Sequence, residues 1–331
     1  MDQTVLVTGG SGHVALFCII KLLKEGYRVR TTVRKLSRKE DVLASIRNSG
    51  LSVGDDEIEF VEADLSSDNG WGDAVKGCKY ILHVASPFPE VQPKNEDEVI
   101  KPAVDGALRV LKAARDDTNV KRVVLTSSNA AIGYGKASEN LGRPLTEDDW
   151  TILDETCSAY VKSKTLAEKA AWNFMGKECG NSKLELVVIN PTAIFGPLLN
   201  SNISASVVMI KNIIKGMPTY PTFSFGVVDV RDVADIHYLA MITEEAKGNR
   251  FLIVSNDKYT TLGHLAKFIK ENMPEISQNI TPPPNDIDQI NFKSGSNERA
   301  KRMFGWNPRP STESIASTVK SLVDFNIVQN K

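Results

Sequence analysis

Short apolar segments rich in β-branched residues recur along the first three-fifths of the chain. Six of them predict β-strands, at residues 4–9, 27–33, 58–64, 80–86, 122–128 and 184–190. Several of these segments are apolar at consecutive positions rather than at every second one. That pattern is typical of strands that are covered on both faces of a sheet.

Helical patterns lie between these predicted strands. Residues 14–26, 96–117 and 158–178 place apolar side chains at every third or fourth position, and the first of them ends on Gly26. Strands that alternate with helices form βαβ units. The predicted fold class is therefore α/β, with a doubly wound parallel sheet of the Rossmann type.

The pattern loosens after Asn190, and this change suggests a second part of the molecule. We expect one more strand at 251–256 and helices near 203–215, 261–272 and 312–326. We predict a Rossmann domain of residues 1–189 plus about 227–256. Residues of about 190–226 and 257–331 would form a smaller, discontinuous lobe over the carboxyl ends of the strands, where such sheets bind ligands.

Composition narrows the class of protein. Of the 331 residues, 41% are hydrophobic and 24% are charged, which is typical of a globular chain with a buried core. Lysine and arginine number 40 against 41 acidic residues. This balance argues against nucleic acid or an anionic membrane surface as a partner.

The sequence also gives expectations about location and metal. No apolar run is long enough for a transmembrane helix, and the N-terminal residues lack the pattern of a signal peptide. The four cysteines have no metal-ligand spacing and are too few for a disulfide scaffold; they are Cys18, Cys78, Cys157 and Cys179. We expect a cytoplasmic protein with reduced thiols and no metal.

A glycine-rich turn joins the first predicted strand to the first predicted helix. Gly9 would allow the tight turn, Gly12 the approach of a pyrophosphate to the backbone, and Ala15 close packing of helix on strand. The helix N-terminus would supply N–H groups and a positive dipole end. We predict a dinucleotide site formed by Thr8, Gly9, Ser11, Gly12, His13 and Val14.

The end of the second predicted strand bears on the choice of dinucleotide. NAD-binding proteins usually carry an acidic residue there, whereas this chain carries Arg34, followed by Lys35, Arg38 and Lys39. A guanidinium can pair with a 2′-phosphate, so we predict NADP(H). A solvated basic turn is the alternative. Asp64, which closes the third strand, would either bind the adenine amino group or cap the strand end.

Two further motifs suggest a proton donor and a hydrogen-bond donor for a carbonyl. Tyr160 and Lys164 are four residues apart in a helical pattern and so share one face. An ammonium beside a phenol, with a positively charged nicotinamide, would favour the phenolate, and lowering the phenol pKa from about 10 to about 7 takes roughly 4 kcal/mol. Ser127 and Ser128 end the fifth strand, where a hydroxyl could bind a carbonyl oxygen.

Taken together, these segments resemble the extended short-chain dehydrogenase/reductases. TGGSGHVA, HVASPF, RVVLTSSNAA, AYVKSK and NPTAIFGP occur in that family's order. Over nearly its whole length the chain looks most like the branch of dihydroflavonol reductases, cinnamoyl-CoA reductases and the yeast and bacterial NADPH-dependent aldehyde, methylglyoxal and ketone reductases. HVASPF and YVKSK favour this branch over the sugar-nucleotide epimerases.

The resemblance implies roles for individual residues. The family's catalytic triad falls on Ser128, Tyr160 and Lys164, with Ser128 chosen over Ser127 because it directly precedes the variable position of TSSxAA. Tyr160 and Lys164 are also implied to contact the cofactor, and the other implied cofactor contacts are Leu65, Ala85, Pro191, Thr192 and Ala193. The implied substrate pocket holds Phe88, Ser128, Ala130, Tyr160, Ile194 and Phe223.

Some positions depart from the family or stay open. His13 replaces a usual Phe, and Asp105 replaces a usual Asn, so their roles are undecided. We expect His83, His237 and His264 to be packed or surface residues rather than catalytic bases. Residues 229–234 should begin a helix with internal ion pairs. Neither a monomer nor a homodimer is excluded.

The resulting hypothesis is an NADPH-dependent carbonyl reductase that transfers hydride to an aldehyde or ketone. Ser128 would bind the carbonyl oxygen, Tyr160 would donate the proton, and Lys164 would act on Tyr160 and the nicotinamide ribose. One alternative is a nucleotide-sugar epimerase or dehydratase. Another is a regulator that senses NADP(H) without turnover. The sequence names neither the physiological substrate nor the product stereochemistry.

Overall fold

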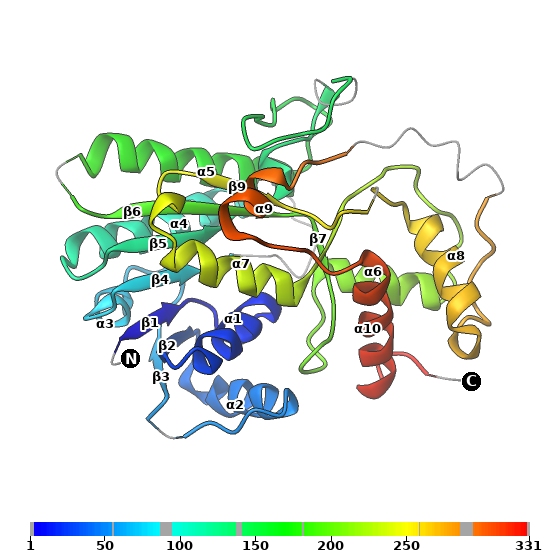
Figure 1. Cartoon of the computed structure of the whole chain (residues 1–331), viewed down its shortest axis with the longest axis horizontal. Helices are drawn as coiled ribbons and strands as arrows, with labels where there is room; N and C mark the ends of the chain where they lie inside the picture. The colour runs from blue at the N-terminus through cyan, green and yellow to red at the C-terminus, as the bar shows by residue number, and fades with distance from the viewer. Residues whose placement is uncertain are drawn as a thin grey trace.

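A parallel seven-stranded sheet forms the centre of the molecule in the computed structural model (Figure 1). The structure describes residues 3–54, 56–86, 95–136, 141–180, 182–257, 259–284 and 294–329. The strand order is β3-β2-β1-β4-β5-β6-β9, and each neighbouring pair is parallel. The strands are β1 (Thr4–Val7), β2 (Arg28–Val33), β3 (Ile58–Glu62), β4 (Tyr80–His83), β5 (Arg122–Thr126), β6 (Glu185–Pro191) and β9 (Arg250–Ile253). The predicted fold class is confirmed.

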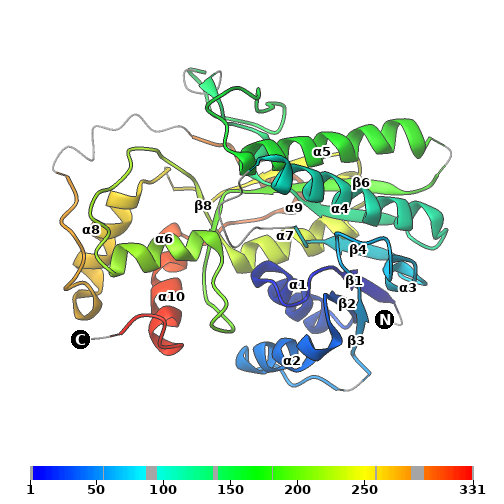
Figure 2. The same cartoon turned by 180° about the vertical axis from the view of Figure 1, so that it is seen from behind.

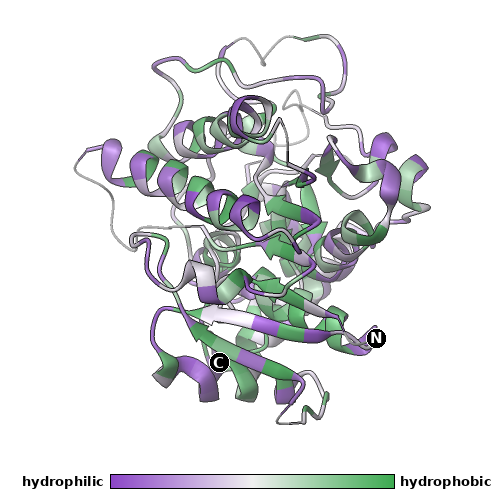
Figure 3. Ribbon diagram, turned by 90° about the vertical axis from the view of Figure 1, so that its left-hand side faces the viewer, coloured by the Kyte–Doolittle hydropathy of each residue, from purple (hydrophilic) through white to green (hydrophobic). Residues whose placement is uncertain are grey.

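Helices cover both faces of this sheet, because its strands are apolar on both sides. One face packs against α1 (His13–Lys24), α2 (Lys39–Asn48), α7 (Val230–Ile242) and α9 (Glu298–Phe304). The other packs against α3 (Trp71–Val75), α4 (Asp97–Asp116) and α5 (Ala159–Glu178), which lie in front in Figure 2. Figure 3 shows the hydrophobic strands between helices whose outer faces are largely hydrophilic.

A smaller group of elements lies to one side of the sheet and has its own hydrophobic core. It contains α6 (Ala205–Ile214), α8 (Leu262–Asn272), α10 (Ser311–Asp324) and the parallel pair β7 (Ala193–Phe195) and β8 (Val227–Asp229). Short 3₁₀ turns complete the described elements: η1 (Leu36–Arg38), η2 (Asn129–Ala131), η4 (Glu244–Ala246) and η5 (Pro274–Ile276). The predicted domain division, including its role in substrate binding, stays a prediction.

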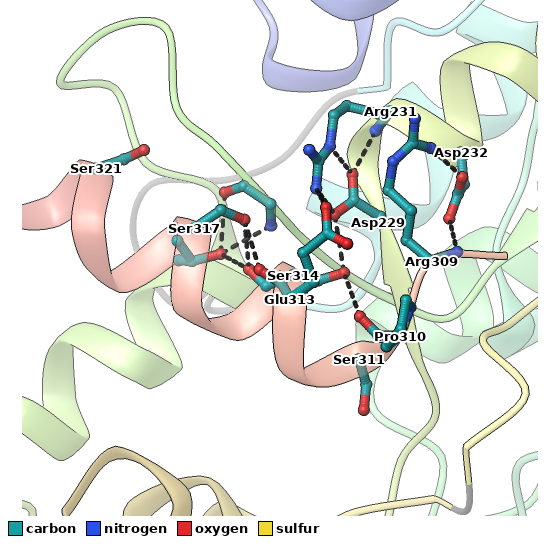
Figure 4. A network of polar contacts seen from close by, with 12 residues as sticks. Asp229, Arg231, Asp232, Arg309, Pro310, Ser311, Glu313, Ser314, Ser317 and Ser321 are labelled. Carbon is teal, nitrogen blue, oxygen red and sulfur yellow. Dashed lines mark hydrogen bonds and ion pairs between the residues drawn. The ribbon is translucent and has the colours of Figure 1, made fainter. Parts of the chain in front are cut away.

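A network of ion pairs and hydrogen bonds ties α10 to the start of α7 (Figure 4). The buried carboxylate of Asp229 caps α7 by accepting from the backbone N–H of Arg231 at 2.8 Å, and it also pairs with the Arg231 guanidinium at 2.7 Å. Ser314 of α10 donates to Asp229 at 2.8 Å. The backbone N–H of Arg309 donates to Asp232 at 2.8 Å. The expected helix start with internal ion pairs is therefore confirmed.

Candidate active site

The glycine loop after β1 forms a tight turn that leads directly into α1. Gly9 has a φ of +72°, and a Cβ at this position would lie 2.9 Å from the Cβ of Ala85. Gly12 precedes α1, and no side chain caps this helix start or places an acid in its first turn. The first-turn N–H groups can therefore bind a phosphate. The loop fits a dinucleotide pyrophosphate.

The side chain of Thr8 links the carboxyl ends of β1 and β4. Its hydroxyl shares a hydrogen bond with Nδ1 of His83 at 2.9 Å and accepts from the backbone N–H groups of Val84 and Ala85, at 3.1 and 2.9 Å. The residue is completely buried. The Thr8 hydroxyl therefore holds the strand ends in place, and a cofactor contact from Thr8 stays a prediction.

His13 occupies the first position of α1 as a packed, neutral ring. It lies edge-on to Phe17, with 5.6 Å between ring centroids. Burial lowers its pKa to about 4, while the nearby charge of Asp229 acts in the opposite direction. Its Nε2 is buried without a hydrogen-bond partner among the described residues. In this structure the imidazole therefore packs as an aromatic ring would.

At the end of β2, Arg34 is exposed beside Asp64. Asp64 accepts hydrogen bonds from the backbone N–H and the hydroxyl of Ser66, at 2.8 and 2.7 Å. These bonds lower the pKa of the Asp64 carboxyl, and the charge of Arg34 adds to the effect. Asp64 thus acts as a cap at the end of β3. Its contact with adenine stays a prediction, as does that of neighbouring Leu65.

Two of the three other basic residues of this turn, Arg38 and Lys39, have partners within the chain. Arg38 pairs with Asp41 at 2.9 Å, and the Lys39 ammonium lies 5.7 Å from the ring centroid of Phe60. The sheet also brings a carboxylate that sequence reasoning missed, because Glu62 of β3 accepts from the N–H of Leu36 at 3.1 Å. Arg34 is therefore the better placed cation for a 2′-phosphate.

The two serines after β5 point in different directions. Ser127 is buried and donates to Glu168 at 2.6 Å. Ser128 is half-buried; its hydroxyl accepts from the N–H of Ala130 at 3.1 Å and from the Tyr160 hydroxyl at 3.5 Å. Ser158 caps α5 and so places Tyr160 in its first turn. Ser128 and Tyr160 thus face each other, whereas Ser127 belongs to the interior.

Charge in the site differs from the expectation in one respect. Desolvation raises the pKa of Tyr160, and the hydrogen bond to Ser128 opposes this only in part. Burial lowers the pKa of Lys164 to about 8, and its ammonium donates to the Ser86 hydroxyl at 2.9 Å. Lys164 is therefore directed at Ser86. The expected lowering of the phenol pKa is not a property of the chain by itself.

Asp105 lies outside this site. It is an exposed residue of α4 and lines a surface groove with Asp68 and Lys112. A relay role for this position is therefore not supported by its place in the fold. His83 and His237 are buried, as expected for packed residues, and their pKa values fall to about 3 and about 4 because of burial.

Of the six predicted pocket residues, Ile194 and Phe223 lie in the lobe, whereas the predicted cofactor contacts Pro191, Thr192 and Ala193 lie at the end of β6 and just after it. Pro191 and Thr192 are buried, and Ala193 and Ile194 belong to β7 and are half-buried. Phe223 is 50% exposed. Ala130 is buried beside Ser128. Phe88 lies outside the described residues. The pocket assignment stays a prediction.

The aromatic residues near Phe223 mainly serve packing within the lobe. Phe225 is buried in the lobe core, with its ring centroid 5.8 Å from that of Phe223. Tyr220 donates to the carbonyl of Thr281 at 2.7 Å. Lobe packing therefore accounts for Tyr220 and Phe225, and the exposed ring of Phe223 is the one that a ligand could reach.

Comparisons with known proteins agree with this geometry. Residues 5–253 match the model of the NAD dependent epimerase/dehydratase family. The chain is 34% identical to cinnamoyl-CoA reductase CAD2 of Medicago truncatula, over 97% of this chain and 96% of that protein. It superposes on yeast methylglyoxal/isovaleraldehyde reductase Gre2 complexed with NADPH with a TM-score of 0.85 and 26% identity, over 98% and 99% of the two chains.

A second solved structure, Gre2 of Candida albicans in complex with NADPH, is 28% identical, with a TM-score of 0.85 and the same coverage of 98% and 99%. In the parts of this chain that the structure describes, no helix has the length and apolar character needed to span a membrane. The same residues contain no group of three or more histidine, cysteine or acidic side chains arranged to hold a metal.

Proposed function

Because the chain belongs to the NAD dependent epimerase/dehydratase family, within the extended short-chain dehydrogenase/reductases, and is an NAD(P)-dependent reductase, we propose that it reduces an aldehyde or ketone with NADPH. One observation carries the proposal. The Tyr160 hydroxyl lies 3.5 Å from that of Ser128 at the carboxyl edge of the sheet, and Lys164 follows one helical turn later. A phenol and a hydroxyl placed in this way suit a carbonyl oxygen that accepts from both.

Each residue of this group has a distinct task. Bound NADPH would supply the hydride to the carbonyl carbon. Ser128 would donate a hydrogen bond to the carbonyl oxygen, and Tyr160 would deliver the proton that the resulting alcohol needs. Lys164, whose pKa lies at about 8, would be mainly charged at neutral pH and would bind the nicotinamide ribose.

The preference for NADPH rests on Arg34. Its guanidinium is exposed at the end of β2, whereas Arg38 already pairs with Asp41. A 2′-phosphate is close to doubly charged and would pair with Arg34. The two Gre2 structures hold NADPH, which supports the same choice. We further propose that the lobe around Ile194 and Phe223 contacts the substrate.

The experiment is an assay of NADPH oxidation with the purified protein and a panel of aldehydes, diketones, keto esters and aryl ketones. Oxidation that depends on one of these carbonyls and is lost in Tyr160→Phe supports the proposal. Tight NADPH binding with no oxidation across the panel would favour a regulator. Conversion of a nucleotide sugar, with no carbonyl reduced, would favour an epimerase or dehydratase.

A further inference from the structure

A buried carboxylate stands directly behind the candidate catalytic residues. Glu168 lies on α5, one turn after Lys164, and its side chain is 0% exposed. Ser127 donates to its Oε2 at 2.6 Å, and Asn190 donates to the same oxygen at 2.7 Å. Such a convergence of donors on a buried carboxylate fixes the donors as well as the acid.

The same network reaches the backbone of the candidate site. The side-chain amide of Asn190 donates to the carbonyl of Ser128 at 3.1 Å as well as to Glu168. Asn190 therefore links the carboxylate to the residue that faces Tyr160. Ser127, which precedes Ser128 in the chain, and Asn190, which binds the Ser128 carbonyl, are thus both held by Glu168.

Arg250 balances the charge of Glu168. Its Nε pairs with Glu168 at 2.5 Å, and its Nη1 donates to the carbonyls of Glu147 and Asp149, each at 2.9 Å. Its guanidinium also lies over the ring of Trp150, 3.7 Å from the centroid. The pair is satisfied on both sides, which a buried ion pair requires.

Lys164 and Glu168 line the same small cavity of about 20 Å³, with Ser86 and Thr126. Among the described residues that line this cavity, His83 from β4 is neutral, since burial lowers its pKa to about 3, and α4 contributes the uncharged Ala103 and Ala107. Glu168 therefore supplies the negative charge that faces the Lys164 ammonium, and it opposes the effect of burial on the pKa of that lysine.

We propose that Glu168 is a positioning residue of this site, which holds Ser128 through Asn190 and Ser127 and presents its negative charge to the Lys164 ammonium across the shared cavity. Arg250 weakens the electrostatic effect of Glu168 on Lys164, because it neutralises part of the charge of Glu168. The role in catalysis rests on the proposed function, but the effect on Lys164 is a property of the chain itself. It can therefore be measured without turnover.

The experiment determines the titration midpoint of Lys164 in the cofactor-free protein. Competitive acetylation is carried out across a pH series, and the fraction of modified Lys164 is read by peptide mass spectrometry. The wild-type midpoint should lie at about 8. In Glu168→Gln it should fall by roughly one pH unit, because the favourable charge is lost and that of Arg250 becomes unbalanced. In Arg250→Gln it should rise, because Glu168 then acts without its partner.

A matched control is available at the other edge of the sheet. Glu185 pairs with the buried Arg122 at 2.7 Å, so Glu185→Gln also removes a carboxylate from a buried arginine. It should lower stability and leave the Lys164 midpoint where it was. Equal midpoints in Glu168→Gln and Glu185→Gln would overturn the proposal. If Glu168→Gln does not fold, Arg250→Gln decides alone, and a midpoint that stays or falls refutes it.

Activity is measured separately on the same variants. The alkaline limb of kcat/KM for carbonyl reduction should move in the same direction as the Lys164 midpoint, which a purely structural defect would not cause. If the variants show the two opposite midpoint shifts but the protein reduces no carbonyl, the role of Glu168 is supported and the proposed function is refuted. If the protein reduces carbonyls but the midpoints do not shift, the proposed function is supported and the role of Glu168 is refuted.

Discussion

The two edges of the central sheet each hold a buried arginine–carboxylate pair, yet the pairs have different surroundings. At the amino edge, Arg122 pairs with Glu185 at 2.7 Å and donates to carbonyls at the end of α7. These contacts join β5, β6 and α7 and involve no residue of the candidate site. At the carboxyl edge, the Glu168–Arg250 pair lies behind Ser128 and the cavity of Lys164. The same type of pair stabilises one edge, and we propose that it arranges chemistry at the other.

Loss of the Tyr160 hydroxyl should give the largest effect. Tyr160→Phe removes the proposed proton donor while the ring remains, so kcat for carbonyl reduction should fall by about 10²–10⁴-fold. NADPH affinity should change little, because Lys164 and the glycine loop are untouched. The measurements are steady-state kinetics and fluorescence titration of NADPH.

The control for this variant is Tyr134→Phe. Tyr134 is close enough to Tyr160 for the phenol of Tyr160 to raise its pKa, although desolvation is the larger cause. Its loss should preserve most of kcat. A Tyr160→Phe variant with more than a tenth of the wild-type kcat would remove Tyr160 from the proposed role.

At the amino edge, the corresponding change should affect stability alone. Glu185→Gln leaves the guanidinium of Arg122, which is 1% exposed, without its main counter-charge. We expect a loss of about 2–4 kcal/mol in the free energy of unfolding, measured by urea titration, with kcat/KM nearly unchanged. Glu178→Gln breaks an exposed pair with Arg115 and should cost less than about 1 kcal/mol. Equal losses in the two variants would contradict the comparison.

The seven strands of the central sheet could be predicted from the sequence, because several of their apolar runs are continuous. The helix α2 was missed: of its ten residues only Val42, Ser45 and Ile46 are buried, so its hydrophobic stripe is too narrow to recognise. The three-residue strands β7 and β8 were missed for lack of any period. They depend on contacts with each other, from Ala193 to Val227 onward.

Within the candidate site, the order of motifs predicted which residues come together but not how charge is distributed. Ser128 and Tyr160 follow from the motifs and the family resemblance. The contact of Ser127 with Glu168, 41 residues later, depends on how α5 packs on β5. The direction of the Tyr160 pKa depends on desolvation, which spacing alone does not contain. Arginines at strand starts, such as Arg122 and Arg250, likewise give no sign in the sequence that they are buried.

The carboxyl edge should be the more sensitive of the two to acid. His83 contacts Thr8, and His237 contacts Thr126 at 2.7 Å; burial lowers their pKa values from 6.5 to about 3 and about 4. The unfolded chain takes up these protons near pH 6.5 and the folded chain does not, so stability is full above this pH and falls below it. At pH 5 each imidazole should cost about 2 kcal/mol.

Urea titrations at pH 7 and pH 5 test this expectation. The raised pKa values of Glu147 and Asp232, which arise from burial, act in the opposite direction, because such carboxyls favour the folded chain as the pH falls. A single variant therefore isolates the histidine effect. His237→Gln should reduce the loss between pH 7 and pH 5 by about 2 kcal/mol. An unchanged pH dependence in this variant would exclude His237 as a cause.

The last predicted effect should be selective for one cofactor. Arg34→Ala should lower kcat/KM for NADPH by about ten- to a hundredfold, because a charge-assisted hydrogen bond contributes roughly 1.5–3 kcal/mol. NADH has no 2′-phosphate and should be used equally well by the variant and the wild type. High salt should weaken the wild-type preference for NADPH, since Arg34 is exposed.

The matched control is Arg38→Ala. The Arg38 guanidinium already pairs with Asp41 at 2.9 Å and should therefore contribute less to NADPH binding. The measurement is kcat/KM for both cofactors at low and high ionic strength; an equal loss with NADPH and NADH in Arg34→Ala would show that Arg34 does not read the phosphate.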